Sequence, residues 1–463
     1  MSEVTAPATQ PVVSPEEKPA RRSHDWRSPR VAVARIRDDS LLRNGILIMF
    51  TTVVNSAFGY AFWLVAAHLF PPSTVGLSAA LISVSTLLSL LASLGASATL
   101  VQSLPVQRSA ADWSLTFWTS MTLATSASLV AGCIVLLLLP LASREFTVLD
   151  SPAYALSFVI GTVAWTAGSI LDSTFIAERR AGNMLGRNSL AAAGKVIAVA
   201  LAALVFAHEV LTLLGAWTAA AMAGAAFGAG LLSHRIGRVS RPSLLAIGQN
   251  ARRVRARLVG NQIIGIGAQM PGYLLPLVVT VRLSASSNAY FYTTWLVCGV
   301  FLIISPAVAT SLFAEGVHAP GSMRNHSKKT LIVIMGLLVP CMILFFVIGP
   351  AILATFGSAY EQRGTLLMQL IILAAVPDAI TNVYVAILRV QHRLAIAAWL
   401  NLGMGVGTVI TAWLLLPALG ISAVGWGWLA MQVAGCFVVM VDLLRGKLAS
   451  PPPPHDHRTA RLA

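Results

Sequence analysis

The residues best placed to do chemistry in this sequence are ionisable side chains inside long apolar stretches. Asp378 directly follows Pro377 within the apolar stretch 364–388. A charged group in hydrocarbon costs about 2.5–3.5 kcal/mol on insertion scales, so such a residue is expected to have a function or a specific partner. We therefore take Asp378 as a candidate for proton or cation coupling. Pairing with Asn382, one helical turn away, is the structural alternative.

A second constellation is formed by Asp172 and Lys195. Asp172 lies eleven positions before Asn183 and Lys195 twelve positions after it, and a turn between two helices is expected at Asn183. On antiparallel helices the two side chains would reach similar depth, which predicts an ion pair between the helices. The alternative is that Lys195 binds an anion in a central cavity, because a lone cation in a membrane needs a partner.

Neutral polar and small residues recur at helical spacing in two further stretches. One face carries Gln262, Gly265, Gln269, Gly272 and Pro276, and another carries Thr52, Asn55, Gly59 and Trp63. Pro271 and Pro276 weaken the first helix, and interrupted helices in transporters usually line the substrate path. The candidate ligand-binding residues are therefore Asn55, Trp63, Gln262 and Gln269. The alternative for both faces is close helix packing through small residues.

Other kinds of site are not indicated. No Gly-rich phosphate loop ending in Gly-Lys-Ser or Gly-Lys-Thr occurs, so we expect no nucleotide hydrolysis. His455 and His457 flank Asp456 without further ligands nearby, and all four cysteines fall within apolar stretches. We therefore expect no metal, no cofactor and no disulfide framework.

The elements that must position these residues are apolar runs long enough to cross a bilayer. Apolar residues make up 56% of the 463 residues and charged residues 11%, whereas about a quarter of a soluble domain is charged. About 20 apolar residues span the hydrocarbon core. Twelve such runs occur, at roughly 44–69, 77–101, 114–140, 152–176, 190–207, 211–233, 258–281, 289–313, 330–355, 364–388, 395–416 and 422–444. The sequence therefore predicts an all-α membrane protein with about twelve transmembrane helices.

The distribution of Lys and Arg predicts how these helices are oriented. With the N-terminus inside, 28 basic residues fall on the inner side, and only Arg144, Arg282 and Arg363 fall on the outer side. Because loops rich in Lys and Arg stay in the cytoplasm, we expect a multi-pass inner-membrane protein with both termini cytoplasmic. The net charge of +15 then reflects membrane topology, and no nucleic-acid partner is expected.

The basic segment 234–257 divides the chain into two halves. We predict a basic cytoplasmic tail at 1–40, six-helix bundles at 41–233 and 258–444 joined by a linker at 234–257, and a second cytoplasmic tail at 445–463. A shift of 209 positions lays Phe175 on Tyr384, Arg180 on Arg389 and Gly194 on Gly403. An even number of helices in each half makes this a parallel repeat, related by a pseudo-two-fold axis along the membrane normal.

Two segments resemble a known superfamily. The first, FWLVAAHLFPPSTVGLSAALISVSTLLSLLASLGASATLVQSLP, covers the first two predicted helices, and LDSTFIAERRAGNMLGRNSLAAAGKV covers the fourth and fifth. The best parts of the second segment are Asp172, Arg180, Arg187, Asn188 and Lys195. The sequence is similar to polysaccharide flippases of the multidrug/oligosaccharidyl-lipid/polysaccharide (MOP) exporter superfamily, loosely over residues 40–445.

The resemblance implies twelve helices in two bundles around a central cavity that opens alternately to each face. It also implies a polyprenyl-pyrophosphate-linked oligosaccharide as cargo, moved from the inner to the outer leaflet during cell-envelope or exopolysaccharide synthesis. Membrane lipids and the polysaccharide synthesis machinery would be further partners. Lys195 is then the only deep candidate contact for the pyrophosphate, and Arg180 and Arg389 near the inner loops are further candidate substrate-binding residues.

Two other functions remain open from the sequence. An ion-coupled multidrug exporter of the same fold would use Asp378. A membrane glycosyltransferase or polymerase usually needs a large outer loop with acidic catalytic residues, whereas the outer loops here hold little beyond Glu145, Asp150, Glu209 and Glu361. We therefore expect a transporter and not an enzyme.

Overall fold

The computed structural model describes residues 40–107, 109–206, 208–236, 242–254, 262–318 and 323–445. The two predicted tails lie almost entirely outside these residues. The compact unit that begins at Asn44 holds every contact discussed below.

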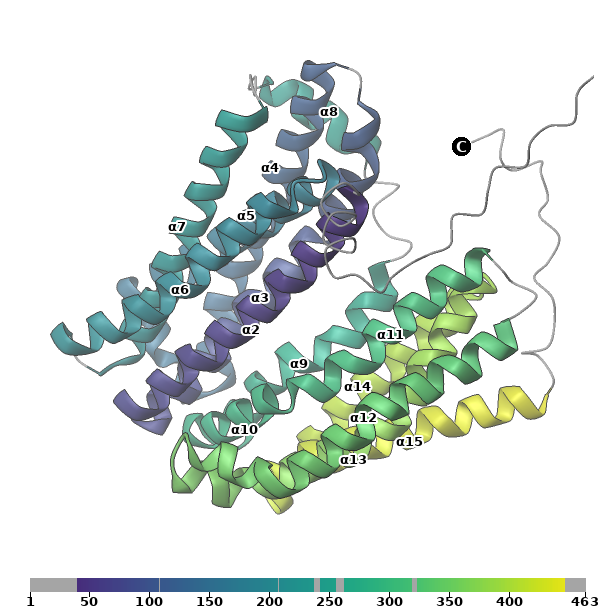
Figure 1. The fold of residues 1–463 in the computed structure, drawn as a ribbon. Coiled ribbons are helices and arrows are strands. Elements are labelled where there is room, and N and C mark those ends of the chain that lie inside the picture. The colour runs from purple at the N-terminus through teal and green to yellow at the C-terminus, as the bar shows by residue number, and fades with distance from the viewer. Residues whose placement is uncertain are drawn as a thin grey trace, which may run out of the picture. The chain divides into compact units, whose positions relative to one another are not determined.

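Every regular element among the described residues is a helix (Figure 1). The first half contains α2 (Ser40–Leu69), α3 (Pro72–Ser103), α4 (Ala110–Ala142), α5 (Pro152–Ala177), α6 (Ala181–Val205) and α7 (Val210–Ile236), with short 3-10 turns η1 (Leu104–Val106) and η2 (Arg144–Asp150). The second half contains α9 (Gln262–Arg282), α10 (Ala285–Val297), α11 (Gly299–His318), α12 (Met323–Ala354), α13 (Ser358–Val390), α14 (Leu394–Leu419) and α15 (Ser422–Leu444). A further helix, α8 (Leu244–Val254), lies between the halves in the sequence.

The helices match the predicted transmembrane runs. Among the described residues, ten helices are long and apolar enough to cross a membrane, namely α2 to α7 and α12 to α15. The segments Ala285–Val297 and Phe301–Ala309 pass the same test together, with a bend of 44° between them. Helix α9 corresponds to the remaining predicted run, at 258–281. The predicted all-α membrane fold is confirmed, and the largest difference is that α6 begins nine residues before the run predicted at 190.

The helix interruption does not lie in the run at 258–281, where Pro271 and Pro276 predicted it. Helix α9 runs without a break through Pro271 and Pro276, and α13 runs without a break through Pro377. The break falls instead at Cys298, which separates α10 from α11 and precedes Gly299. Glycine stabilises a helix less than any residue except proline, so Gly299 makes this a weak point in the span.

The two halves repeat one another with a shift of 213 positions. Helices α3 and α10 begin at Pro72 and Ala285, α4 and α12 at Ala110 and Met323, and α6 and α14 at Ala181 and Leu394, and each pair of numbers differs by 213. The turns after α5 and α13 agree as well, because their left-handed residues are Arg179 and His392. The predicted parallel repeat is therefore present, but the shift of 209 was wrong by four residues, about one helical turn.

The halves meet where α3 crosses α10. A Cβ atom on Gly76 would overlap the carbonyl oxygen of Ala285 and lie 2.7 Å from the backbone nitrogen of Ala289. The side chain of Asn288 donates a 2.7 Å hydrogen bond to the carbonyl oxygen of Gly76 in the same place. Gly76 and Ala289 are themselves related by the 213-residue shift, so the contact joins equivalent positions of the two repeats, and only glycine permits the approach.

Burial separates central from peripheral helices in each half. In α3 and in α13, 67% of the residues in the most apolar 18-residue stretch are buried inside the protein, whereas in α2 and α12 only 11% are. Central α3 packs on α4, α5 and α10, and central α13 packs on α11, α12 and α15. Helix α13 carries the buried Asp378, and α5, which packs on α3, carries Asp172.

The predicted linker contains the packed helix α8. Its residue Ile247 is buried, and the Asn250 side chain donates a 3.1 Å hydrogen bond to the hydroxyl of Thr119 in α4. The described part of segment 234–257 is thus attached to the first bundle.

Candidate functional site

A cavity of about 1170 Å³ is lined by residues of both halves. The first half contributes from α2 and α3, and the second half from α9 to α15. Its aromatic lining consists of Tyr60, Tyr273, Tyr292, Trp295, Phe345 and Trp428. Its polar lining includes Thr52, Asn55, Ser56, Ser83, Thr86, Gln269, Thr381, Asn382, Asn401, Thr408 and Gln432. Asp378 is the single charged residue among the described residues that line it, and none of them is lysine or arginine.

Asp378 is held in the cavity wall by neutral donors. Asn382 Nδ2 donates to Asp378 Oδ2 at 2.9 Å, and Gln432 Nε2 of α15 donates to Asp378 Oδ1 at 3.1 Å. The hydroxyl of Thr381 lies 3.1 Å from Gln432 Oε1 and orients that amide in turn. The pairing with Asn382 proposed from the sequence is confirmed. Asp378 is only 7% exposed, and its carboxyl group has no ion-pair partner among the described residues.

The backbone around Pro377 is tied to neighbouring helices. The carbonyl oxygen of Pro377 accepts a 3.4 Å hydrogen bond from the thiol of Cys436 in α15. The next carbonyl oxygen, that of Asp378, accepts one of the same length from Ser305 in α11. Proline removes one hydrogen bond from a helix interior. The contacts from Cys436 and Ser305 attach α13 to α15 and α11 next to that position.

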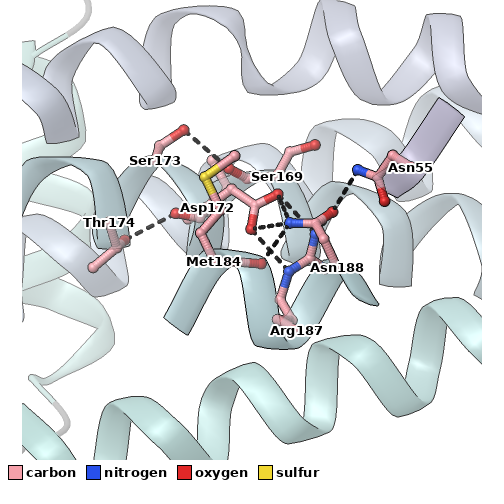
Figure 2. Close-up of polar contacts among 9 residues, drawn as sticks. Asn55, Ser169, Asp172, Ser173, Thr174, Met184, Arg187 and Asn188 are labelled. Carbon is pink, nitrogen blue, oxygen red and sulfur yellow. Dashed lines mark hydrogen bonds and ion pairs between the residues drawn. The ribbon is translucent and has the colours of Figure 1, made fainter. Parts of the chain in front are cut away.

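The first half has a polar cluster of a different kind, between α5, α6 and α2 (Figure 2). Arg187 forms a bidentate ion pair with Asp172, with Nε 2.9 Å from Oδ1 and Nη2 2.7 Å from Oδ2. Asn188 Nδ2 donates to both carboxylate oxygens, at 3.0 and 3.1 Å. Asn55 of α2 reaches the cluster by donating to Asn188 Oδ1 at 3.2 Å. This charge-balanced network joins three helices.

Glycines make the space for the Arg187 side chain. A Cβ atom on Gly168 of α5 would meet the Arg187 guanidinium, and one on Gly228 of α7 would lie 2.8 Å from Arg187 Cδ. Because the Arg187 and Asp172 side chains are only 9% and 19% exposed, the two charges depend on each other for compensation.

The predicted ion pair between Asp172 and Lys195 was wrong. The sequence predicted the turn between α5 and α6 at Asn183, but it lies four residues earlier, at Arg179. Asp172 is seven positions before Arg179 and Arg187 is eight positions after it, so those two side chains reach the same depth. Because the turn lies four residues earlier than predicted, the residue of α6 at the depth of Asp172 is Arg187, about two helical turns before Lys195.

Lys195 occupies a separate position on α6. It is half-buried, and its Nζ lies 5.8 Å from the centroid of the Phe62 ring of α2, a cation–π geometry. It is not among the described residues that line the cavity. Its predicted role as an anion-binding group in a central cavity therefore remains a prediction, and its observed contact is aromatic.

The other predicted binding residues fall in different places. Asn55 and Gln269 line the cavity. Trp63 is not a described lining residue, but its ring packs edge-on against that of cavity-lining Tyr292, with the ring centroids 4.8 Å apart. Gln262 begins α9, and its side chain lies outside what the structure describes. Arg180 precedes α6 and Arg389 lies in the last turn of α13, and neither is among the described lining residues.

Several cavity residues were not found from the sequence. Gln432 and Asn401 are neutral polar residues in apolar runs, and they carry no charge whose insertion cost would mark them as candidates. Asn401 follows Asn188 by 213 positions, so the correct repeat shift is the signal that links it to the polar cluster of the first half. Trp295 and Trp428 pack edge-to-face at 5.3 Å, a tertiary contact that no spacing in the sequence predicts.

Comparison with known proteins gives a fold but no sequence family. No protein-family model matches the chain, and no curated protein matches it. Among solved structures, an inward-facing conformation of a multidrug resistance MATE family transporter of the MOP superfamily matches with a TM-score of 0.63 and 14% identity, over 85% of this chain and 94% of that chain.

Two further solved structures agree. The lipid II flippase MurJ, in an inward closed conformation, matches with a TM-score of 0.69 and 10% identity over 87% of each chain. A MOP superfamily transporter from Pyrococcus furiosus, with a binding pocket of reversed polarity that suggests a different function for it, matches with a TM-score of 0.57 and 13% identity, over 89% of this chain and 95% of that chain. The chain therefore has the fold of the membrane transporters of the MOP superfamily.

Proposed function

We propose that this protein carries a polyprenyl-pyrophosphate-linked oligosaccharide from the inner to the outer leaflet, by alternating access, for cell-envelope or exopolysaccharide synthesis. The observation that carries the proposal is the size and lining of the cavity. Its 1170 Å³ exceed the roughly 300–1,000 Å³ of pockets for drug-sized ligands. A cargo with several sugar residues makes fuller use of this space than a small drug.

The chemistry of the lining supports a glycan. Aromatic faces such as those of Trp295 and Trp428 pack against the apolar faces of sugar rings, and amide and hydroxyl groups form hydrogen bonds with sugar hydroxyls. Uncharged groups of this kind suit the sugar portion of the cargo. The pyrophosphate requires cations, which we assign to Lys195, Arg180 and Arg389 outside the described lining.

The repeat supports the mechanism. Two halves of equivalent helix order meet at the contact between Gly76 and α10, and the cavity is lined from both. Movement of one half against the other about this contact would expose the cavity to each face in turn, provided that the two states are similar in free energy. The lipid tail would remain in the bilayer while the head group crosses. We place the protein in the inner membrane with both termini in the cytoplasm.

The test is to deplete the protein in its native host and to determine which leaflet holds the polyprenyl-linked glycans. A membrane-impermeant reagent that modifies sugars separates outward-facing from protected molecules. We expect protected, inward-facing lipid-linked oligosaccharide to accumulate and to clear when the wild-type chain is restored. An unchanged distribution of these lipids in depleted cells would rule out the proposal.

An ion-coupled multidrug exporter is the second candidate, and the observation that favours it is Asp378. A carboxyl group in the cavity wall with only neutral donors is suited to carry a proton or a cation. Drug efflux that is lost in Asp378→Asn, in cells whose lipid-linked glycans are normally distributed, would favour this candidate over the flippase.

A further inference from the structure

The polar cluster of the first half fixes which atom of Asn188 faces Asn55. Arg187 Nη2 donates to Asn188 Oδ1 at 3.0 Å, while Asn188 Nδ2 lies within 3.1 Å of both oxygens of Asp172 and donates to the carbonyl oxygen of Met184 at 2.9 Å. A rotated amide would place N–H groups against the guanidinium and an oxygen against the carboxylate. The ion pair therefore holds Asn188 in one orientation.

This orientation determines the polarity of Asn55. Asn188 presents an oxygen to α2, so only the amide nitrogen of Asn55 can make the 3.2 Å contact with it. Asn55 Oδ1 is left without a hydrogen bond to the described residues, and Figure 2 shows it turned away from Asn188. Asn55 also lines the cavity. The ion pair thus fixes Asn55 Oδ1 as the free acceptor for a ligand, while Asn55 Nδ2 keeps one of its two hydrogens on Asn188.

We propose that Asn55 is a specificity-determining residue that accepts a hydrogen bond from a sugar hydroxyl of the cargo, with Asp172, Arg187 and Asn188 acting as positioning residues. The inference rests on the proposed function and names the group that the site reads. Hydroxyl-bearing neighbours such as Thr52 and Ser56 rotate to donate or to accept, and so cannot make this distinction. Asn55 cannot reverse while the ion pair holds Asn188.

The test measures hydrogen-bond polarity directly. The probes are farnesyl pyrophosphate carrying N-acetylglucosamine or galactose, together with analogues in which one hydroxyl at a time is replaced by fluorine, a group of similar size that cannot donate. Binding to the purified full-length protein in lipid nanodiscs is followed by tryptophan fluorescence. In the wild-type protein we expect one position at which fluorine weakens binding by about 3- to 10-fold, the usual range for one hydrogen bond.

The variant Asn55→Leu should bind the parent probe more weakly and should lose the difference between hydroxyl and fluorine at that position. Such a cycle isolates the pairwise interaction from a general loss of affinity. Asn44→Leu is the matched control, because Asn44 lies on the same helix and accepts a 2.9 Å hydrogen bond from the backbone of Ala181, but is not a described lining residue. It should keep the full hydroxyl preference.

Asn188→Leu tests the positioning role. Without Asn188 Oδ1, the amide of Asn55 is free to rotate, so discrimination between hydroxyl and fluorine should fall below about 2-fold while the parent probe still binds. The double variant Asp172→Asn/Arg187→Gln, which frees Asn188 to rotate, should behave in the same way. A role limited to packing would weaken all probes equally and leave the discrimination intact.

The outcomes separate this inference from the proposed function. Wild-type binding of the parent probe with no position coupled to Asn55 would overturn the inference and leave the flippase proposal standing. A wild-type protein that binds neither parent probe would also overturn it, because both probes carry hydroxyl donors. The leaflet experiment in depleted cells decides the flippase proposal independently.

Discussion

The two halves share a helix order but treat a buried carboxyl group in opposite ways. In the first half, Asp172 has a bidentate counter-ion in Arg187. In the second half, Asp378 has amide donors from Asn382 and Gln432. The 213-residue shift lays Val385 on Asp172 and Trp165 on Asp378, so neither cluster has a copy in the other half. The repeat supplies equivalent helices, but the two buried carboxyl groups occupy positions that are not equivalent.

The difference indicates a division of labour. A carboxylate with a built-in guanidinium is electrically complete and has no need of a mobile ion, so the first cluster is suited to hold three helices and to orient Asn55. A carboxyl group with only neutral donors is uncharged when it carries a proton, and when it is ionised its charge can be balanced by a bound cation. Any ion coupling is therefore expected in the second half.

The largest effect expected from this contrast is that of Arg187→Met. Removal of the guanidinium leaves the buried Asp172 carboxylate uncompensated, which should lower the free energy of unfolding by about 3–5 kcal/mol. Unfolding of the purified protein by sodium dodecyl sulfate measures the change. The double variant Asp172→Leu/Arg187→Leu should recover most of the loss, since no lone charge remains. If the single variant were as stable as the wild type, the charge of Asp172 would not depend on Arg187 for compensation.

Crowding the ion pair should have the next largest effect. In Gly228→Ala the new methyl group would lie 2.8 Å from Arg187 Cδ, and overpacking of this kind costs about 1–3 kcal/mol. The control is Gly194→Ala on α6, where the methyl group would meet only Ala220 Cβ at 4.0 Å and should stabilise the helix by up to about 1 kcal/mol. Equal stability of the two variants would show that the Arg187 side chain has room to move.

Neutralising the carboxyl group of the second half should cost less. In Asp378→Asn the amide of Gln432 can rotate, because its partner Thr381 is a hydroxyl that either donates or accepts. We expect a loss of about 0.5–1.5 kcal/mol, the net contribution of one hydrogen bond. A loss as large as that of Arg187→Met would show that Asp378 is a structural charge, contrary to the division of labour. A loss this small would allow transport by this variant to be measured without interference from unfolding.

The smallest effect is expected for Lys195→Ala. Its cation–π contact with Phe62 is half-buried and should contribute about 0.5–1 kcal/mol to stability. Loss of glycolipid transport at normal abundance would support the assignment of Lys195 to the pyrophosphate. Full transport by both Lys195→Ala and Asp378→Asn would reduce the two residues to packing roles.

The helices were predictable because bilayer thickness fixes the length of an apolar run, and the run predicted at 422–444 coincides with α15. Partners across helices were harder. The pairing of Asp172 with Arg187 depends on where the chain turns, and the sequence AGN at 181–183 has the composition of a turn but begins α6. Turn residues are a local preference that a packed helix start overrides.

The repeat shift shows a second limit of the sequence. Residues four positions apart lie on the same face of a helix, so a shift of 209 matches residue types nearly as well as the structural shift of 213. The break at Cys298 was also not predicted: its counterpart Ser85 lies within the continuous helix α3, and no proline marks the difference. The wall of the cavity, including Trp428 and Gln432, is set by tertiary packing that helical periodicity does not record.

The crossing of α3 with α10 has a consequence for the order of assembly. Ala285 follows Gly76 by 209 residues, whereas Arg187 follows Asp172 by 15. At about 5–20 residues per second of synthesis, the ion pair can form within about 1–3 s of the appearance of Asp172, but Gly76 waits about 10–40 s for its partner helix. During that interval the most buried helix of the first half has one face without its final neighbour. We expect this nascent half to be the stage at which the cell's membrane insertion machinery has the longest access to the chain.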